Sequence, residues 1–264
     1  MLISQVLEEK KILIKGLEAN YKVSGQGPAF FILHGWGGSS DSWINVQKVL
    51  AGEKFQVIIP DFPGFGKSLT PKEPWEVNNY VEWLKSFIEQ MKVKTPFFLL
   101  GHSFGGRIAI KFAARYPENI KALILCSSAG IKSKKSFKNK MFYYLGRIGE
   151  YLFSQKPLLK FKNGARNTFY QIIRQRDYLQ AKGVMKETVK KVLAEDLMGY
   201  LSQIKAETLI LWGENDRMVP IKYGYIMAKE ISKAKMITFP KIGHSPHLEI
   251  PDKLAKEILL FIKS

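Results

Sequence analysis

The sequence Phe97-Phe98-Leu99-Leu100-Gly101-His102-Ser103-Phe104-Gly105-Gly106 joins a short apolar run to a glycine-rich turn, and a helical pattern follows at once. The apolar run predicts a buried strand, and the next residues predict a helix that Pro117 stops. A Gly-X-Ser-X-Gly pattern at such a turn is typical of a serine lifted clear of a sheet for nucleophilic attack. By itself the pattern fits equally well a tight turn with an ordinary serine, so the rest of the chain must distinguish the two.

The composition favours a globular protein with a full core. The chain has 264 residues, of which 46% are hydrophobic, and this suits one domain with a large insertion. No apolar run is long enough to span a membrane, and residues 1–15 lack the apolar stretch of a signal peptide. The single cysteine, Cys126, excludes an intrachain disulfide and is expected to be a buried thiol. We therefore expect a cytoplasmic protein without a membrane span.

The charge is strongly positive, with a net value of +18. Such a charge invites a nucleic-acid partner. However, only 7 of the 41 basic residues are arginine, the residue suited to bidentate phosphate recognition. No helix-turn-helix, zinc-finger or RNA-binding motif accompanies the charge, and we do not expect nucleic-acid binding.

Short apolar strands alternate with helical patterns along most of the chain. Residues 2–23 are expected to form strands, with the runs 11–15 and 18–23 joined by a hairpin or a short bend. Further strands are expected at 29–33, 55–59, 97–101, 120–126, 208–212 and 235–239. This order predicts an α/β fold with a mostly parallel twisted sheet flanked by helices. Ligands in such sheets bind at the carboxyl ends of the strands. Four polar residues each follow a strand and are expected to share one rim: His34, Asp61, Ser103 and Ser127.

Residues 131–200 interrupt this alternation. They show no clear buried strand, and helical, aromatic-rich segments alternate with lysines. This segment carries 16 Lys and Arg against 5 Asp and Glu, a net charge of +11. We expect a helical cap, or lid, at 131–200 inserted into a core domain formed by 1–130 and 201–264. The aromatic residues line a substrate pocket or form the core of the cap itself, and the basic excess is a solvated surface or docks an acidic partner.

A nucleophilic serine needs a base, and the base needs an acid that orients it. After Ser103 the chain supplies Asp216 just past the strand at 208–212, and His244 just past the last strand. Together with the segments 34–37 (His-Gly-Trp-Gly), 61–68 (Asp-Phe-Pro-Gly-Phe-Gly-Lys-Ser) and 213–220, these pieces resemble the α/β-hydrolase-fold serine hydrolases. The resemblance covers nearly the whole chain and is closest to carboxylesterase-like members with a helical cap.

The resemblance implies a role for each piece. Ser103 is the nucleophile, His244 is the general base, and Asp216 orients the imidazole. The backbone N–H groups of Phe104 and Trp36 form the oxyanion hole. No cofactor and no metal are implied.

Several residues compete for these roles or lie beside them. Glu214 is a second acid near Asp216, and His247 is a second histidine near His244; the family pattern favours Asp216 and His244. Three further polar residues are expected to be structural: His34, as a brace of the oxyanion loop, His102, as a packed residue, and Asp61, as scaffolding.

These roles imply a serine hydrolase that acts on carboxylic esters through an acyl-enzyme. A C–C bond hydrolase or an aminopeptidase could use the same triad, and a slow-turnover ligand receptor or partner-binding protein is the alternative of another class. Dehalogenases and epoxide hydrolases of this fold carry aspartate at the nucleophile position. The segment 34–37 is also similar to that of pimeloyl-carrier-protein methyl esterases, whose elbow commonly carries Trp where His102 stands. An ester linked to an acyl carrier is therefore one expected substrate, while the substrate-binding residues and the oligomeric state stay open.

Overall fold

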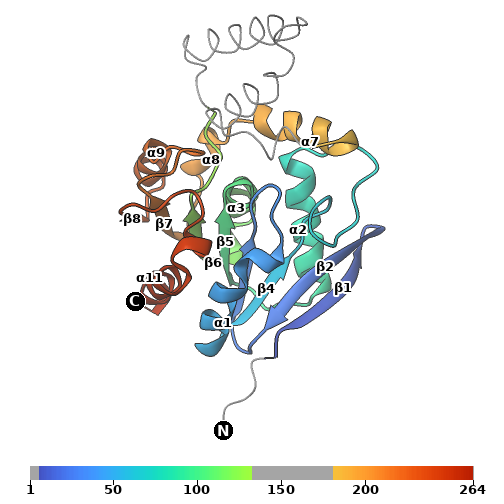
Figure 1. Ribbon diagram of the computed structural model, residues 1–264, viewed down its shortest axis with the longest axis horizontal. Helices are drawn as coiled ribbons and strands as arrows, with labels where there is room; N and C mark the ends of the chain where they lie inside the picture. The colour runs from blue at the N-terminus through green and yellow to red at the C-terminus, as the bar shows by residue number, and fades with distance from the viewer. Residues whose placement is uncertain (1–5, 133–180, 264) are drawn as a thin grey trace, which may run out of the picture.

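The structure is a computed structural model that describes residues 6–132 and 181–263, and Figure 1 shows the arrangement of its elements. Eight strands form one sheet in the order β1-β2-β4-β3-β5-β6-β7-β8. The strands from β3 to β8 run parallel, and β2 pairs antiparallel with both β1 and β4. The predicted mostly parallel sheet is therefore confirmed. The strands are β1 (Glu8–Ile14), β2 (Leu17–Ser24), β3 (Ala29–Leu33), β4 (Gln56–Pro60), β5 (Phe97–His102), β6 (Ile120–Cys126), β7 (Glu207–Gly213) and β8 (Ala234–Phe239).

The central strands are buried on both faces, because helices cover both sides of the sheet. Every residue of β3 and of β5 is buried. One face packs against α1 (Ile44–Gly52) and α11 (Pro251–Lys263). The other packs against α2 (Val77–Gln90), α3 (Phe104–Arg115) and α9 (Lys222–Glu230). Continuous apolar strands of this kind are the mark of a parallel sheet between two helical layers.

The start of helix α2 is determined by a local sequence motif. Glu76 and Asn79 form a capping box in which the Asn79 side chain accepts from the Glu76 backbone N–H at 2.9 Å. The helical spacing of Tyr80, Trp83 and Phe87 in the sequence predicts an amphipathic helix at 76–91. The helix lies at Val77–Gln90, and these three side chains are buried against the sheet.

The hairpin at the start of the chain is longer than its apolar pattern predicts. Strand β1 begins at Glu8, within the predicted range 2–23 and three residues before the run at 11–15, and Glu8 pairs with Val23 of β2. The additional residues Glu8, Glu9 and Lys10 are exposed and charged, so they give no apolar signal. They lie on the edge strand of the sheet, where charged side chains discourage pairing with another chain.

Only part of the predicted cap lies within the described residues. Within 181–200, α7 (Gly183–Ala194) and α8 (Met198–Leu201) are helical, as expected. Residues 133–180 lie outside the described residues, so the division into core and cap stays a prediction. In Figure 1, α7 lies in the upper part of the view, above α2. The Trp75 N–H donates to Thr188 Oγ1 at 3.1 Å, which joins α7 to the segment before α2.

The end of this segment is attached to α3. The Lys111 ammonium pairs with the Glu195 carboxylate at 2.5 Å, and Arg107 donates to the Glu195 carbonyl at 3.0 Å. The Lys111 side chain is only 8% exposed, so water screens this pair weakly. Across the two described ranges, no helix is both long and apolar enough to cross a bilayer.

Candidate active site

Ser103 lies in a strained turn between β5 and α3. Its φ of 51° and ψ of −113° place a non-glycine residue in a sparsely populated region. Backbone atoms pack closely within and against this turn. A Cβ on Gly105 would lie 2.3 Å from the Leu33 carbonyl oxygen, and a Cβ on Gly101 would lie 2.6 Å from the Gly105 carbonyl oxygen. Glycine is therefore required at both positions, as the motif predicts.

The structure brings Ser103, His244 and Asp216 together from three separate loops. His244 Nε2 lies 3.0 Å from Ser103 Oγ, and His244 Nδ1 lies 2.8 Å from Asp216 Oδ2. A carboxylate can only accept, so Nδ1 carries the proton and Nε2 presents its lone pair to the serine hydroxyl. The imidazole is thus in the tautomer that can receive the Ser103 proton.

Asp216 is held by its own loop after β7. Its Oδ1 accepts the backbone N–H groups of Met218 and Val219, each at 2.9 Å, and the side chain is fully buried. Oδ2 is left to face His244. The Asn215 N–H donates to the Ile242 carbonyl at 2.8 Å, so the acid loop and the histidine loop are joined directly.

The segment after β3 lies against the serine and is braced by a histidine. A Cβ on Gly35 would lie 3.3 Å from Ser103 Cβ. His34 Nε2 accepts the Phe62 N–H at 3.1 Å, so its proton is on Nδ1, which donates to the Gly35 carbonyl at 2.8 Å. Because a trans peptide points its C=O and N–H in opposite directions, this bond fixes the direction of the Trp36 N–H. The prediction that His34 braces this segment is confirmed.

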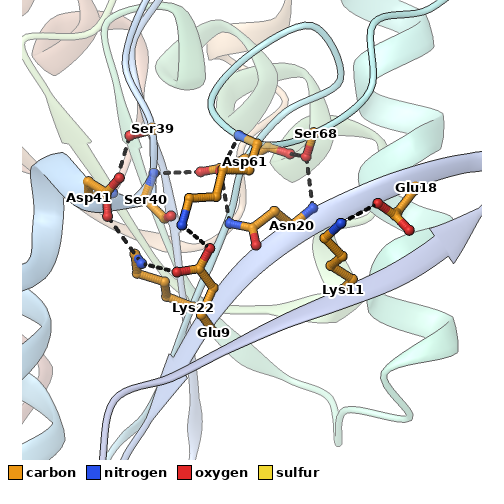
Figure 2. A network of polar contacts seen from close by, with 11 residues as sticks. Glu9, Lys11, Glu18, Asn20, Lys22, Ser39, Ser40, Asp41, Asp61 and Ser68 are labelled. Atoms are coloured by element: carbon orange, nitrogen blue, oxygen red, sulfur yellow. Dashed lines mark hydrogen bonds and ion pairs between the residues drawn. The ribbon is translucent and has the colours of Figure 1, made fainter.

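Asp61 anchors the same segment from its far side (Figure 2). Its Oδ1 accepts the Ser40 N–H at 2.6 Å, and Oδ2 accepts from Asn20 Nδ2 at 2.9 Å and from the Lys67 N–H at 3.0 Å. Ser68 Oγ donates to the Asp61 carbonyl at 2.7 Å. The carboxylate is thus satisfied by structural donors, in agreement with its predicted role as scaffolding.

An ion-pair network joins the N-terminal hairpin to these loops, as Figure 2 also shows. Lys22 Nζ lies 2.9 Å from Glu9 Oε2 and 3.1 Å from Asp41 Oδ1, and Lys67 Nζ lies 2.5 Å from Glu9 Oε1. The bonds from Lys67 and Lys22 lower the pKa of Glu9 to about 2. Strands β1 and β2 are therefore bonded to the segment that follows β3, which carries Trp36, and to the loop that follows β4.

The chain matches the α/β hydrolase fold family over residues 28–251. This range contains Ser103, Asp216 and His244, as well as the supporting residues His34 and Asp61. The chain belongs to the α/β-hydrolase fold family.

Relatives of this α/β hydrolase include two kinds of enzyme. The mouse (Mus musculus) protein "Monoacylglycerol lipase ABHD6" is 27% identical, over 91% of this chain and 77% of the relative. A "2-hydroxy-6-oxo-6-phenylhexa-2,4-dienoate hydrolase" of Burkholderia cepacia is 29% identical, over 94% of this chain and 93% of the relative. Among solved structures, the esterase EaEST of Exiguobacterium antarcticum has a TM-score of 0.75 at 21% identity, covering 97% of this chain and 100% of that one, which supports the fold alone. Together these findings support a hydrolase.

The competing residues of this α/β hydrolase lie away from the serine hydroxyl. Glu214 is exposed and accepts from Thr238 Oγ1 at 2.9 Å. His247 stacks on Trp43, with ring centroids 4.2 Å apart and an angle of 5° between the planes. Neither Glu214 nor His247 bonds to His244 or Ser103, so the geometry favours Asp216 and His244.

Two supporting residues were not predicted from the sequence. Glu249 accepts the Gly243 N–H at 3.0 Å and orders the loop that carries His244. His102 was expected only to pack, but its Nε2 also lies 2.9 Å from the His244 carbonyl oxygen. The His102 bond has no signal in sequence spacing, because it joins residues 142 positions apart. The Glu249 bond spans only 6 positions, but it belongs to none of the motifs that the sequence offers.

Three buried histidines make the stability of this α/β hydrolase sensitive to acid. Burial lowers the pKa of His34, of His102 and of His247, the last to about 3. The unfolded chain takes up protons on these rings as the pH falls through about 6.5, whereas the folded protein takes them up only at lower pH. Below about pH 6.5 each ring therefore lowers the free energy of unfolding, until the pH reaches the lowered pKa of that ring in the folded protein.

We expect the urea midpoint to be constant above about pH 7 and to fall steeply between about pH 6 and pH 4.5. The variant His247→Phe keeps a ring on Trp43 but cannot take up a proton, so its stability should fall less steeply with pH. A urea midpoint that stays the same from pH 7.5 to pH 4.5 would contradict this account.

Proposed function

We propose that the protein is a serine hydrolase that cleaves carboxylic esters through an acyl-enzyme on Ser103. The single observation that carries the proposal is the position of the His244 ring, which lies 3.0 Å from Ser103 Oγ and 2.8 Å from Asp216 Oδ2. A serine hydroxyl is a weak nucleophile until a base can take its proton, and this arrangement supplies the base and its orienting acid.

In the first half-reaction, Ser103 Oγ attacks the ester carbonyl carbon while its proton moves to His244 Nε2. The tetrahedral intermediate then collapses, the C–O bond to the alcohol breaks, and His244 returns the proton to the leaving oxygen. The acyl group is left on Ser103. Asp216 stabilises the imidazolium that forms in between without taking its proton.

In the second half-reaction, water takes the place of the alcohol. His244 removes a proton from the water as its oxygen attacks the acyl carbon. The second tetrahedral intermediate expels Ser103 Oγ, which recovers the proton from His244. The products are a carboxylic acid and the free enzyme.

The negative oxygen of each intermediate is proposed to bind the backbone N–H groups of Phe104 and Trp36. Phe104 is the first residue of α3, where N–H groups lack helical partners and the helix dipole favours an anion. Support for Trp36 comes from the contact of Gly35 with Ser103 and from the His34 bond that orients the Gly35–Trp36 peptide. Each such donor contributes about 10²–10³ in rate.

A C–C bond hydrolase is the second candidate, because the Burkholderia cepacia relative is described as a dienoate hydrolase. The same serine, base and acid serve that chemistry. Ester hydrolysis is preferred as the proposed activity because it requires only the serine, the base, the acid and the two backbone N–H donors described above. A dienoate adds a carboxylate that needs a positive partner near Ser103.

We expect p-nitrophenyl esters to be turned over repeatedly, with kcat/KM at least about 10²-fold above that for a 2-hydroxy-6-oxo-dienoate or for Pro-β-naphthylamide, a difference of about 3 kcal/mol in activation free energy. An ester series from acetate to decanoate then defines the acyl length. A higher kcat/KM on the dienoate would favour the second candidate. One burst equivalent without further turnover would favour the slow receptor.

The acyl-carrier partner and the cytoplasmic location stay predictions. Binding of an acidic acyl-carrier protein that relies on surface charge should weaken as ionic strength rises. Binding that is unchanged between low and high salt would count against a partner that is bound through the basic residues of the cap.

A further inference from the structure

His102, the residue before Ser103, is buried and makes one directed hydrogen bond. It ends β5, it is 5% exposed, and its Nε2 lies 2.9 Å from the backbone carbonyl oxygen of His244. A carbonyl only accepts, so Nε2 carries the proton and donates it. His102 Nδ1 then holds a lone pair, faces Gly35, and has no hydrogen-bond partner among the described residues.

A layer of rings keeps the His102 imidazole in this orientation. His102 packs against His247 at a centroid distance of 4.6 Å and edge-on to Trp43 at 5.9 Å. On its other side, a Cβ on Gly35 would lie only 2.9 Å from Nδ1. The ring therefore has little freedom to turn, and burial disfavours a second proton on it.

The loop that carries His244 is held on both sides of the histidine. Glu249 accepts the N–H groups of Gly243 and Ser245, and the Asp216 carboxylate meets the imidazole. The Ser245 N–H shares a peptide with the His244 carbonyl, but its bond to Glu249 is long, at 3.4 Å. His102 bonds the carbonyl oxygen itself at 2.9 Å, so the two consecutive residues His102 and Ser103 contact the same histidine, one at its backbone and one at its ring.

We propose that His102 is a positioning residue whose Nε2–H holds the His244 carbonyl, and through it the His244 ring, in register with Ser103. The proposal rests on the proposed function, since it assigns His244 the role of base. A misplacement of the base by about 1 Å lowers the rate by about 10²-fold, and this sets the size of the effect.

The test compares two replacements of similar length. His102→Gln keeps an N–H donor within reach of the carbonyl, whereas His102→Met keeps the length and removes the donor. We expect His102→Met to lower kcat for p-nitrophenyl butyrate by about 10- to 100-fold, with KM within about twofold. His102→Gln should recover kcat to within about threefold of the wild type. Equal kcat in the wild type and both variants, or equal loss in both, would overturn the proposal.

A measurement on the wild type keeps the test independent of how the variants fold. Proton–nitrogen NMR at pH 7 should show His102 protonated on Nε2 and not on Nδ1. The opposite tautomer would overturn the proposal. A wild type that neither hydrolyses the ester nor reacts with a fluorophosphonate would instead refute the proposed function, so the two failures are distinguishable.

Discussion

Replacement of Ser103 by alanine is expected to lower kcat for p-nitrophenyl butyrate by about 10⁶-fold. The variant has no oxygen to attack the acyl carbon, and the base 3.0 Å away then has no proton to take. Alanine has the same backbone restrictions as serine, so we expect the strained turn and the thermal midpoint to be retained. Steady-state hydrolysis and a thermal scan of the same preparation check both statements.

Ser127→Ala is the matched control. Ser127 also lies just past the end of a central strand, is fully buried, and has a positive φ of 43°. Its Oγ has no hydrogen-bond partner within the described part of the chain. We expect this variant to keep kcat within a few-fold. Ester hydrolysis that survives in Ser103→Ala and disappears in Ser127→Ala would place the nucleophile elsewhere.

Replacement of Asp216 by asparagine is expected to lower kcat by about 10⁴-fold with little change in KM. The wild-type carboxylate accepts the His244 Nδ1–H at 2.8 Å and so keeps the lone pair on Nε2. The backbone N–H groups of Met218 and Val219 hold the other oxygen, so an amide would place its NH₂ group toward His244. That group donates, and it selects the tautomer that cannot take the Ser103 proton.

Glu214→Gln distinguishes the orienting acid from its neighbour. Glu214 is exposed and accepts from Thr238 Oγ1, and it makes no bond to His244. We expect kcat to change by less than about twofold. A loss in Glu214→Gln that equals the loss in Asp216→Asn would show that the local loop matters and the carboxylate at Asp216 does not.

The parallel sheet could be predicted because its strands are apolar on both faces. Strand β3 and residues 122–126 of β6 (Ile120–Cys126) are unbroken apolar runs in the sequence, and in the structure they are buried in the centre of the sheet. The start of β1 within the predicted range 2–23 could not be located for the converse reason: Glu8 and Glu9 pair through the backbone while their side chains stay exposed. A hydropathy pattern indicates which side chains are buried, and the first residues of this edge strand bury none of theirs.

The juxtaposition of Ser103, Asp216 and His244 could be predicted, because each residue follows a strand and the three occur in the order typical of the fold. Their catalytic roles stay a proposal. What the sequence does not report is how side chains from distant loops meet. The bond from His102 to the His244 carbonyl spans 142 positions, and the bond from Ser40 to Asp61 spans 21. A turn motif gives the location of a residue along the chain, whereas its partners depend on the folded arrangement.

The most direct test of the central claim, that Ser103 is a nucleophile activated by His244, is covalent labelling with a fluorophosphonate followed by peptide mapping. The account predicts one equivalent of label, carried by Ser103, no label on Ser103→Ala, and labelling of a His244→Gln variant slowed by at least about 10³-fold. Label on a different residue, or labelling at an equal rate with and without His244, would contradict it.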